Sequence, residues 1–94
     1  MKSVYVVVSY DIPDNRRRAK VCKTLKNFGQ HVQYSVFECQ LKTKDFQKLR
    51  ARLQKLIRPE EDNLRFYFLC EACVERIKAI GAERVDPRSP FYVV

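Results

Sequence analysis

The fold of this chain depends on one stretch, Val4-Tyr5-Val6-Val7-Val8-Ser9-Tyr10-Asp11. Six of its first seven residues are β-branched or aromatic, a composition typical of a strand that is buried on both faces. The apolar run then ends at a carboxylate, Asp11, and the arginines Arg16, Arg17 and Arg18 follow shortly after it. A central strand that carries an acid to its end, beside a basic helix start, is a suitable place to hold a metal ion against a phosphate.

Length and composition indicate one folded domain. The chain has 94 residues, of which 46% are hydrophobic, and it holds no low-complexity run, so disorder is not expected. No apolar run approaches the ~20 residues that cross a bilayer, and no signal-type segment stands at the N-terminus. We therefore expect a cytoplasmic protein that has no membrane partner.

The positive charge is concentrated in two segments. The formal net charge is +8, and residues 14–26 and 42–58 together hold 13 of the 19 lysines and arginines but only two of the 11 acids. This distribution is expected of a protein that binds a polyanion such as nucleic acid. A merely solvated helix surface is the alternative that the charge leaves open.

The four cysteines do not form a zinc or disulfide pattern. One Cys-x-x-Cys pair is present (Cys70 and Cys73), and the single histidine, His31, lacks the spacing of a zinc finger. Cys22 falls in a predicted helix, whereas Cys39 and Cys70 fall in strand-like runs. This placement favours buried, reduced thiols over metal ligands.

A helix is predicted after the first strand. Asp14 or Asn15 can serve as its N-cap, and Gly29 is predicted to close it as a left-handed C-cap. Residues 31–41 have a strand-like composition but are long for one strand, so a bend or tight hairpin is expected near residues 33–35. The apolar stripe of the helix consists of Val21, Leu25 and Phe28.

A second helix follows, with Thr43 as its predicted N-cap and Pro59 marking its end. Residues 64–70 alternate as a half-buried or central strand does. Residues 74–80 suit either a short strand or a helix. The second helix has an apolar stripe of Phe46, Leu49, Leu53, Leu56 and Ile57.

This order of elements fits an α+β, ferredoxin-like sandwich, in which two helices cover one face of an antiparallel sheet. We expect a single domain over residues 1–94, with a core over about 1–80 and a tail over 81–94. The other sheet face needs a cover, which a homodimer packed face to face would provide. The tail ends in an apolar segment that is predicted to add to a sheet edge: Phe91, Tyr92, Val93 and Val94.

The sequence also resembles a known family. Tyr10-Asp11-Ile12, the arginine-rich helix start, and Val32-Gln33-x-Ser35-Val36-Phe37-Glu38 three residues after Gly29 are similar to CRISPR-associated protein 2. The terminal apolar segment matches too, so the resemblance covers essentially the whole chain. Members of this family are small partners of the CRISPR integrase in spacer acquisition.

The resemblance implies a ferredoxin-like homodimer in which Asp11 of each protomer faces its counterpart across the twofold axis. The two carboxylates would hold Mg²⁺ or Mn²⁺, and the protein would be a metal-dependent endonuclease that acts on single-stranded RNA or double-stranded DNA. The alternative is a non-catalytic scaffold that binds DNA and bridges the integrase subunits. His31 stands where the family usually carries a basic residue.

The candidate site follows from both arguments. Asp11 is the predicted catalytic and metal-binding residue, with a turn or helix cap as the structural alternative. Tyr10 could position substrate or be an ordinary strand aromatic, and Phe37 could shape a cleft or belong to the core. No Gly-rich phosphate loop and no RNA-recognition aromatic signature compete with this site. The predicted nucleic-acid-binding residues are Tyr10, Arg16, Arg17, Arg18, Lys20, His31 and Ser35.

Overall fold

The computed structural model describes residues 3–80. Its elements are β1 (Ser3–Asp11), α1 (Asn15–Lys26), β2 (Gln30–Gln33), β3 (Val36–Lys42), α2 (Thr43–Leu56), β4 (Asn63–Leu69) and α3 (Glu71–Glu75). Within these residues, no helix is long and apolar enough to span a membrane.

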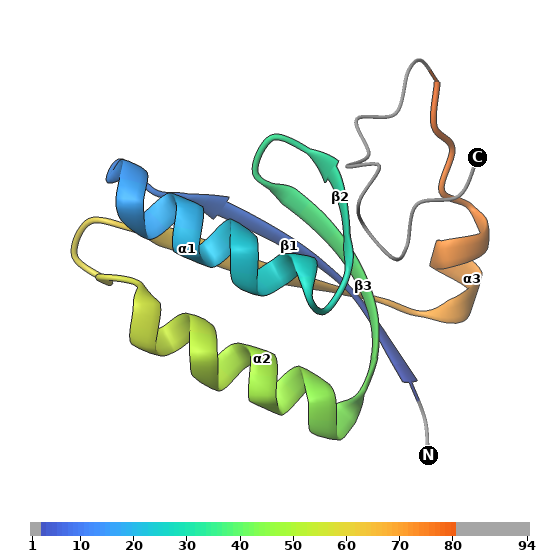
Figure 1. Cartoon of the computed structure of the whole chain (residues 1–94). Coiled ribbons are helices and arrows are strands. Elements are labelled where there is room, and N and C mark those ends of the chain that lie inside the picture. Colours follow the sequence, from blue (N-terminus) through green and yellow to red (C-terminus); the bar gives the residue numbers. More distant parts are fainter. Residues whose placement is uncertain (1–2, 81–94) are drawn as a thin grey trace.

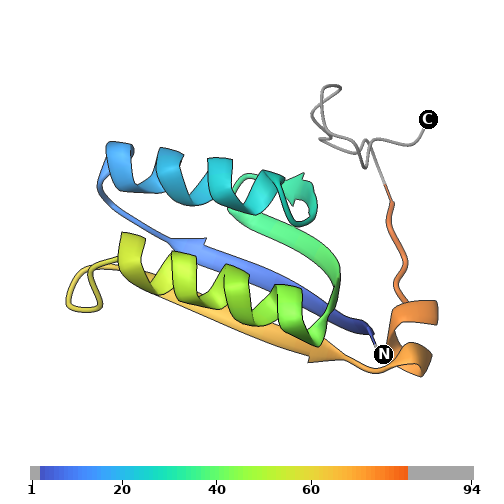
Figure 2. The ribbon, with the colours of Figure 1, turned by 60° about the horizontal axis from the view of Figure 1, so that its bottom comes forward.

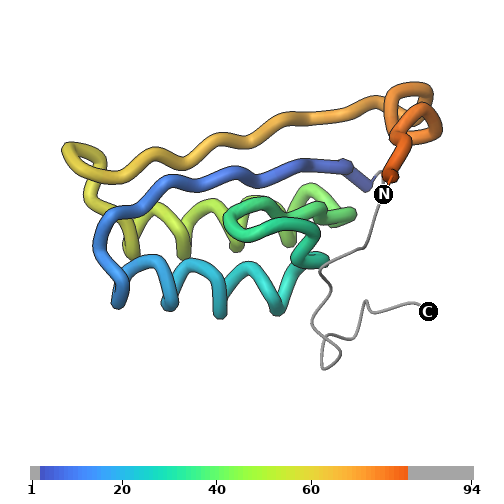
Figure 3. Tube along the Cα trace, turned by 90° about the horizontal axis from the view of Figure 1, so that it is seen from above, coloured from blue at the N-terminus to red at the C-terminus, as the bar shows by residue number. Residues whose placement is uncertain are grey.

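The four strands form one antiparallel sheet in the order β2-β3-β1-β4. Helices α1 and α2 lie side by side on one face of this sheet, which gives a two-layer arrangement (Figures 1 and 2). Seen along the sheet, the helices occupy one side of the strands (Figure 3). The ferredoxin-like fold predicted above is therefore confirmed. We call the other side of the sheet the open face, because no described element covers it.

The core lies between the sheet and the two helices. Val6 and Val8 of β1 are fully buried, and they pair across the sheet with Cys39 and Phe37 of β3. Helices α1 and α2 close the core with four residues that have no exposed surface: Val21, Leu25, Leu49 and Leu53. Burying such side chains contributes about 1.5–3 kcal/mol each, so this layer supplies most of the stability of the chain.

Strand β1 is central, as predicted, but only one of its faces is buried within a single chain. Tyr5 and Val7 alternate with the buried residues and point to the open face, where both are half-buried. On the neighbouring strand, Tyr67 lies opposite Val7 and is 47% exposed. The expectation of burial on both faces is thus met on the helix side alone.

Helix α1 begins as predicted but ends differently. Asp14 is its N-cap, and the Asp14 carboxylate accepts a hydrogen bond from the backbone N–H of Arg17 at 2.8 Å. The C-cap is Asn27 in a right-handed conformation, and Gly29 is not left-handed. The predicted glycine C-cap is therefore wrong. A glycine stands there because an added Cβ would lie 2.3 Å from Cys39 Sγ.

The predicted hairpin is confirmed, because β2 and β3 are joined by a turn at Tyr34 and Ser35. Helix α2 starts one residue earlier than predicted. Thr43 is the first helical residue and Lys42 is the N-cap, since Lys42 still pairs with Ser3 in the sheet and the strand runs directly into the helix. The helix ends at Leu56, as the proline at position 59 indicated.

The last described residues resolve the ambiguity over 74–80. Helix α3 includes Val74 and ends at Glu75, and residues 76–80 form no strand. Cys39 is buried as predicted, but Cys70 is exposed, because β4 ends at Leu69 and Cys70 becomes the N-cap of α3. The predicted edge strand over 91–94 lies outside the described residues.

Candidate functional site

Asp11 is the last residue of β1 and is exposed. It follows buried Tyr10, so the alternation of a strand places it on the open face. Its partner in the register is Asn63, the first residue of β4. The strand end is held by the β2–β3 turn, because Tyr10 N–H donates to the carbonyl oxygen of Ser35 at 3.1 Å. The structure therefore presents one carboxylate at a fixed, solvent-accessible strand end.

Tyr10 belongs to the core rather than to the surface that carries Asp11. Its side chain is 4% exposed, and its ring lies 6.4 Å from that of Phe37. The hydroxyl donates to the carbonyl oxygen of Tyr34 at 3.4 Å. Burial, together with a hydrogen bond to Cys22, raises the pKa of Tyr10 well above its usual value. These contacts favour the structural interpretation of Tyr10, and Phe37 is fully buried.

The basic residues at the start of α1 differ in what they contact. Arg16 and Lys20 are exposed. Arg18 Nη1 donates to the carbonyl oxygen of Ile12 at 2.9 Å, and its Nη2 bonds to the side chain of Asn15. Arg18 therefore folds back onto the residue that follows Asp11, which places its charge close to the strand end.

Arg17 is held by two carboxylates from the loop between α2 and β4. Its Nε and Nη2 donate to Asp62 at 2.9 and 3.1 Å, and Nη2 also donates to Glu61 at 2.7 Å. Asp62, whose side chain has no exposed surface, also accepts from the backbone N–H of Arg58 at 2.9 Å. The bond from Arg17 lowers the pKa of the Asp62 carboxyl. Arg17 thus fastens α1 to the start of β4, next to the Asp11–Asn63 pair.

His31 and Ser35 lie at the β2–β3 hairpin. The His31 ring stacks on Phe37 with centroids 4.4 Å apart, and its Nε2–H donates to the carbonyl oxygen of Tyr34 at 2.8 Å. Ser35 is half-buried in the turn, and its carbonyl is the acceptor for Tyr10 N–H. Both residues therefore support the hairpin that holds the end of β1.

Arg65 is a cation near the site that the sequence interpretation missed. It lies opposite Ser9 on the open face and is exposed. Its Nε donates to Asn63 Oδ1 at 3.2 Å, and its Nη1 donates to the Tyr67 hydroxyl at 3.3 Å. Alternation along β4 identifies the face of Arg65, but its distance from Asp11 depends on the register of β4 against β1. That register could not be deduced from the sequence.

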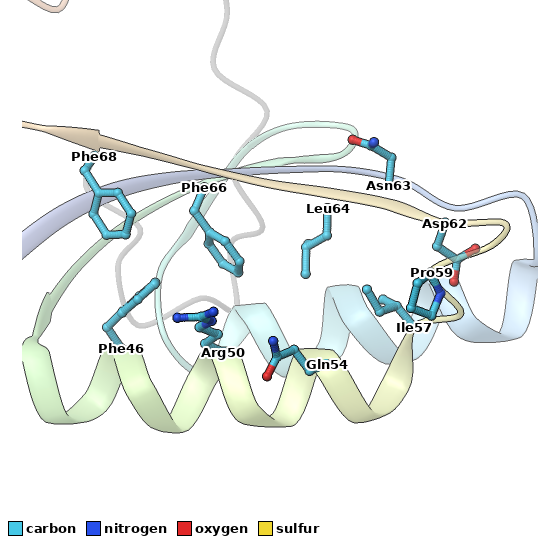
Figure 4. A pocket seen from close by; sticks show the side chains of 10 residues that line it. All are labelled: Phe46, Arg50, Gln54, Ile57, Pro59, Asp62, Asn63, Leu64, Phe66 and Phe68. Carbon is cyan, nitrogen blue, oxygen red and sulfur yellow. The ribbon is translucent and has the colours of Figure 1, made fainter.

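A groove of about 500 Å³ runs between α2 and β4. Figure 4 shows Phe46, Phe66 and Phe68 pointing into this space. The ring of Phe46 packs edge-on against those of Phe66 and Phe68, with ring centroids 5.4 and 5.1 Å apart. Phe68 nevertheless remains 58% exposed. Strand β4 is an edge strand among the described residues, so this border of the sheet combines unpaired backbone groups with apolar side chains.

Asp11 fits a hard divalent cation only as part of a larger set of ligands. Residues 3–80 contain no group of three His, Cys, Asp or Glu side chains that could bind a metal. A cation such as Mg²⁺ binds through one or two carboxylates and keeps several waters. An exposed carboxylate from each of two chains would satisfy that requirement.

Comparison with known proteins identifies the family. The family model described as CRISPR associated protein Cas2 matches residues 4–77. The chain belongs to the Cas2 family. A relative from Thermus thermophilus named CRISPR-associated endoribonuclease Cas2 is 46% identical over 83 residues, which cover 88% of each chain.

Solved Cas2 structures share the fold. Streptococcus pyogenes Cas2 has a TM-score of 0.74 and 33% identity to this chain, and the similarity covers 82% of this chain and 99% of that one. A chain of a partial Cas6-RT-Cas1–Cas2 complex has a TM-score of 0.72 and 31% identity, covering 82% and 90%.

Proposed function

We propose that this Cas2-family protein acts in CRISPR adaptation as a metal-dependent endonuclease that hydrolyses phosphodiester bonds. The observation that carries the proposal is the exposed Asp11 carboxylate at the end of β1, on the open face and beside the basic start of α1. The endoribonuclease names of relatives such as the Thermus thermophilus protein support single-stranded RNA as a substrate. Double-stranded DNA is the second substrate to test.

The active form in this proposal is a homodimer that packs through the open face. This face carries an apolar surface that remains partly exposed in one chain and consists of Tyr5, Val7, Tyr67 and Leu69. Such surfaces on small proteins are usually covered by a partner. An isologous pairing of two open faces would bring two copies of Asp11 toward the same axis.

The two Asp11 carboxylates would hold Mg²⁺ or Mn²⁺ in this dimer. A divalent cation bound there would polarise a phosphoryl oxygen and would lower the pKa of a bound water. Arg16 and Lys20, which are exposed on the first turns of α1, are suited to hold neighbouring phosphates. Arg18 adds positive charge near the strand end, whereas Arg17 is occupied by Glu61 and Asp62.

The test compares Asp11→Asn with Asp45→Asn, which makes the same chemical change on α2. Cleavage of single-stranded RNA and of duplex DNA is measured with Mg²⁺, with Mn²⁺ and with EDTA. We expect Asp11→Asn and EDTA each to reduce cleavage by at least about 100-fold, while Asp45→Asn cuts normally. Undiminished cleavage by Asp11→Asn would contradict the catalytic assignment.

The similarity to a chain of a Cas1–Cas2 complex supports a second role, as a scaffold that bridges the subunits of the CRISPR integrase. The apolar border of β4 offers an edge to which a strand can add, and we propose that residues 91–94 make such an edge contact. Deleting these residues should weaken dimerisation or integrase binding more than metal binding. A truncated protein that dimerises and binds its integrase normally would contradict this role.

A further inference from the structure

The four cysteines occupy two kinds of environment. Cys39 is fully buried and Cys22 is half-buried, so both are shielded by the core. Cys70 and Cys73 are both exposed. They lie at the point where β4 ends and α3 begins, at the opposite end of β4 from the loop that follows α2 (Figure 1).

The two exposed thiols lie on the same turn of the chain. Cys70 is the N-cap of α3, and Cys73 is the third residue of that helix. Both side chains are exposed to solvent. Residues at this spacing share one face of a helical turn, so the side chains can join after only a small movement.

The surroundings of the two sulfurs shift their pKa values in opposite directions. The hydrogen bonds from Cys73 and Ala72 lower the pKa of Cys70, whereas the bond to Cys70 raises the pKa of Cys73. Cys70 is therefore the more nucleophilic member at neutral pH. A hollow of about 880 Å³ beside it, lined in part by Tyr5, Leu69 and Val74, leaves room for a small molecule to reach the sulfur.

We propose that Cys70 and Cys73 form a redox-active dithiol that closes to an intramolecular disulfide by exchange with a small aliphatic disulfide. The Cys70 thiolate attacks one sulfur of the reagent, which breaks the reagent's S–S bond, forms a mixed disulfide and releases one thiolate. Cys73 then gives up its proton, and its sulfur attacks the Cys70 sulfur and expels the second thiolate. The protein loses two electrons and two protons, and one reagent disulfide becomes two thiols.

The disulfide between Cys70 and Cys73 would alter the structure of α3 more than that of the core. Only Val74 of α3 is half-buried, and the other residues of that helix are exposed. A bond between Cys70 and Cys73 would thus become the main constraint on this turn. Reduction by excess thiol reverses the reaction, so the pair would report the thiol–disulfide balance of its surroundings.

The test uses the full-length reduced protein, oxidised glutathione as the probe, and alkylation of the remaining thiols in denaturant before digestion with trypsin. Cleavage after Arg65 and Arg76 releases residues 66–76, which contain Cys70 and Cys73 but neither of the other cysteines. We expect this peptide to be two hydrogens lighter and to take up no alkyl group after oxidation. Peptides that contain Cys22 and Cys39 should be fully alkylated.

Serine variants identify the order of the steps. Cys73→Ser should accumulate a mixed disulfide of Cys70 with glutathione, and Cys70→Ser should lose the reaction. Cys22→Ser is the matched control and should react as the natural sequence does, with circular dichroism verifying that all three variants fold. A peptide 66–76 that takes up two alkyl groups after oxidation, or a mixed disulfide that persists in the natural sequence, would overturn the proposal.

Discussion

Gly29 shows how a single residue can be required by packing alone. A Cβ at this position would lie 2.3 Å from Cys39 Sγ and 2.6 Å from the backbone carbonyl oxygen of Glu38. Because the carbonyl belongs to a central part of the sheet, it cannot move aside without disturbing β3. Gly29→Ala should therefore lower the free energy of unfolding by about 2 kcal/mol or more.

Urea unfolding of Gly29→Ala measures this effect. Ala51→Gly, on the exposed side of α2, gives the size of an ordinary glycine–alanine exchange, which is about 1 kcal/mol. A Gly29→Ala variant as stable as the natural sequence would contradict the close approach of Gly29 to β3.

The buried Cys39 thiol makes the free energy of unfolding depend on pH in the alkaline range. Burial raises the pKa of the Cys39 thiol to about 12. The folded chain thus holds this proton more tightly than the unfolded chain, whose thiol ionises near its ordinary value. The stabilisation is complete below the ordinary thiol pKa and is lost as the pH rises toward 12, at no more than about 1.4 kcal/mol per pH unit.

Urea unfolding at pH 8 and pH 10 tests this dependence. Cys39→Ala should be less stable than the natural sequence at pH 8 but should lose less stability between the two pH values. Val6→Ala, which shortens the buried side chain that pairs with Cys39 but removes no titratable group, is the control and should lose as much as the natural sequence does. Equal losses in Cys39→Ala and the natural sequence would contradict the role of the buried thiol.

Within helix α1, neighbouring arginines have different surroundings. Arg16 is exposed, whereas Arg17 is bound to Glu61 and to buried Asp62. Arg16→Ala should reduce the slope of log affinity against log salt for duplex DNA by about 0.9 and leave stability unchanged. Arg17→Ala should leave the slope nearly unchanged and destabilise the protein, because it leaves the Asp62 carboxylate without its partner.

Fluorescence anisotropy with duplex DNA at several salt concentrations, together with urea unfolding, separates these two effects. If Arg17→Ala lowered the slope as much as Arg16→Ala and folded with normal stability, Arg17 would be a phosphate ligand rather than an anchor.

The elements themselves were largely predictable from the sequence. Periodicity locates α1, α2 and β4, and the length of the run over 31–41 indicates the β2–β3 hairpin, because local patterns record which residues face the core. Errors arose where tertiary contacts decide the outcome. The local pattern predicts a helix cap at Gly29, but a glycine is required there by its close approach to β3. The same kind of pattern extends the last strand to Cys70, whereas β4 ends at Leu69.

The candidate site was only partly predictable, for the same reason. Asp11 follows from the end of an apolar run, but Arg17 and Arg18 look alike in the sequence and differ only in their long-range partners. Arg65 enters the neighbourhood of Asp11 through the pairing of β4 with β1. Strand register depends on the whole sheet, so a local pattern could not supply it.

At the scale of the whole molecule, the open face of the sheet should determine the oligomeric state. Tyr67 is 47% exposed on this face, opposite Val7. Tyr67→Glu places a charge in the proposed interface and should convert a dimer into a monomer of 11.2 kDa. Gln47→Glu, on the exposed surface of α2, makes a comparable change away from the interface and should remain a dimer. Light scattering after size-exclusion chromatography gives both masses, and a dimeric Tyr67→Glu would contradict packing through the open face.

In the proposed dimer, two copies of Asp11 share one cation across a twofold axis. Titration with Mn²⁺, followed by electron paramagnetic resonance, counts the bound ions in the natural sequence and in Asp11→Asn. We expect one ion for every two chains and loss of that ion in Asp11→Asn. One ion per chain, or unchanged binding by Asp11→Asn, would contradict it.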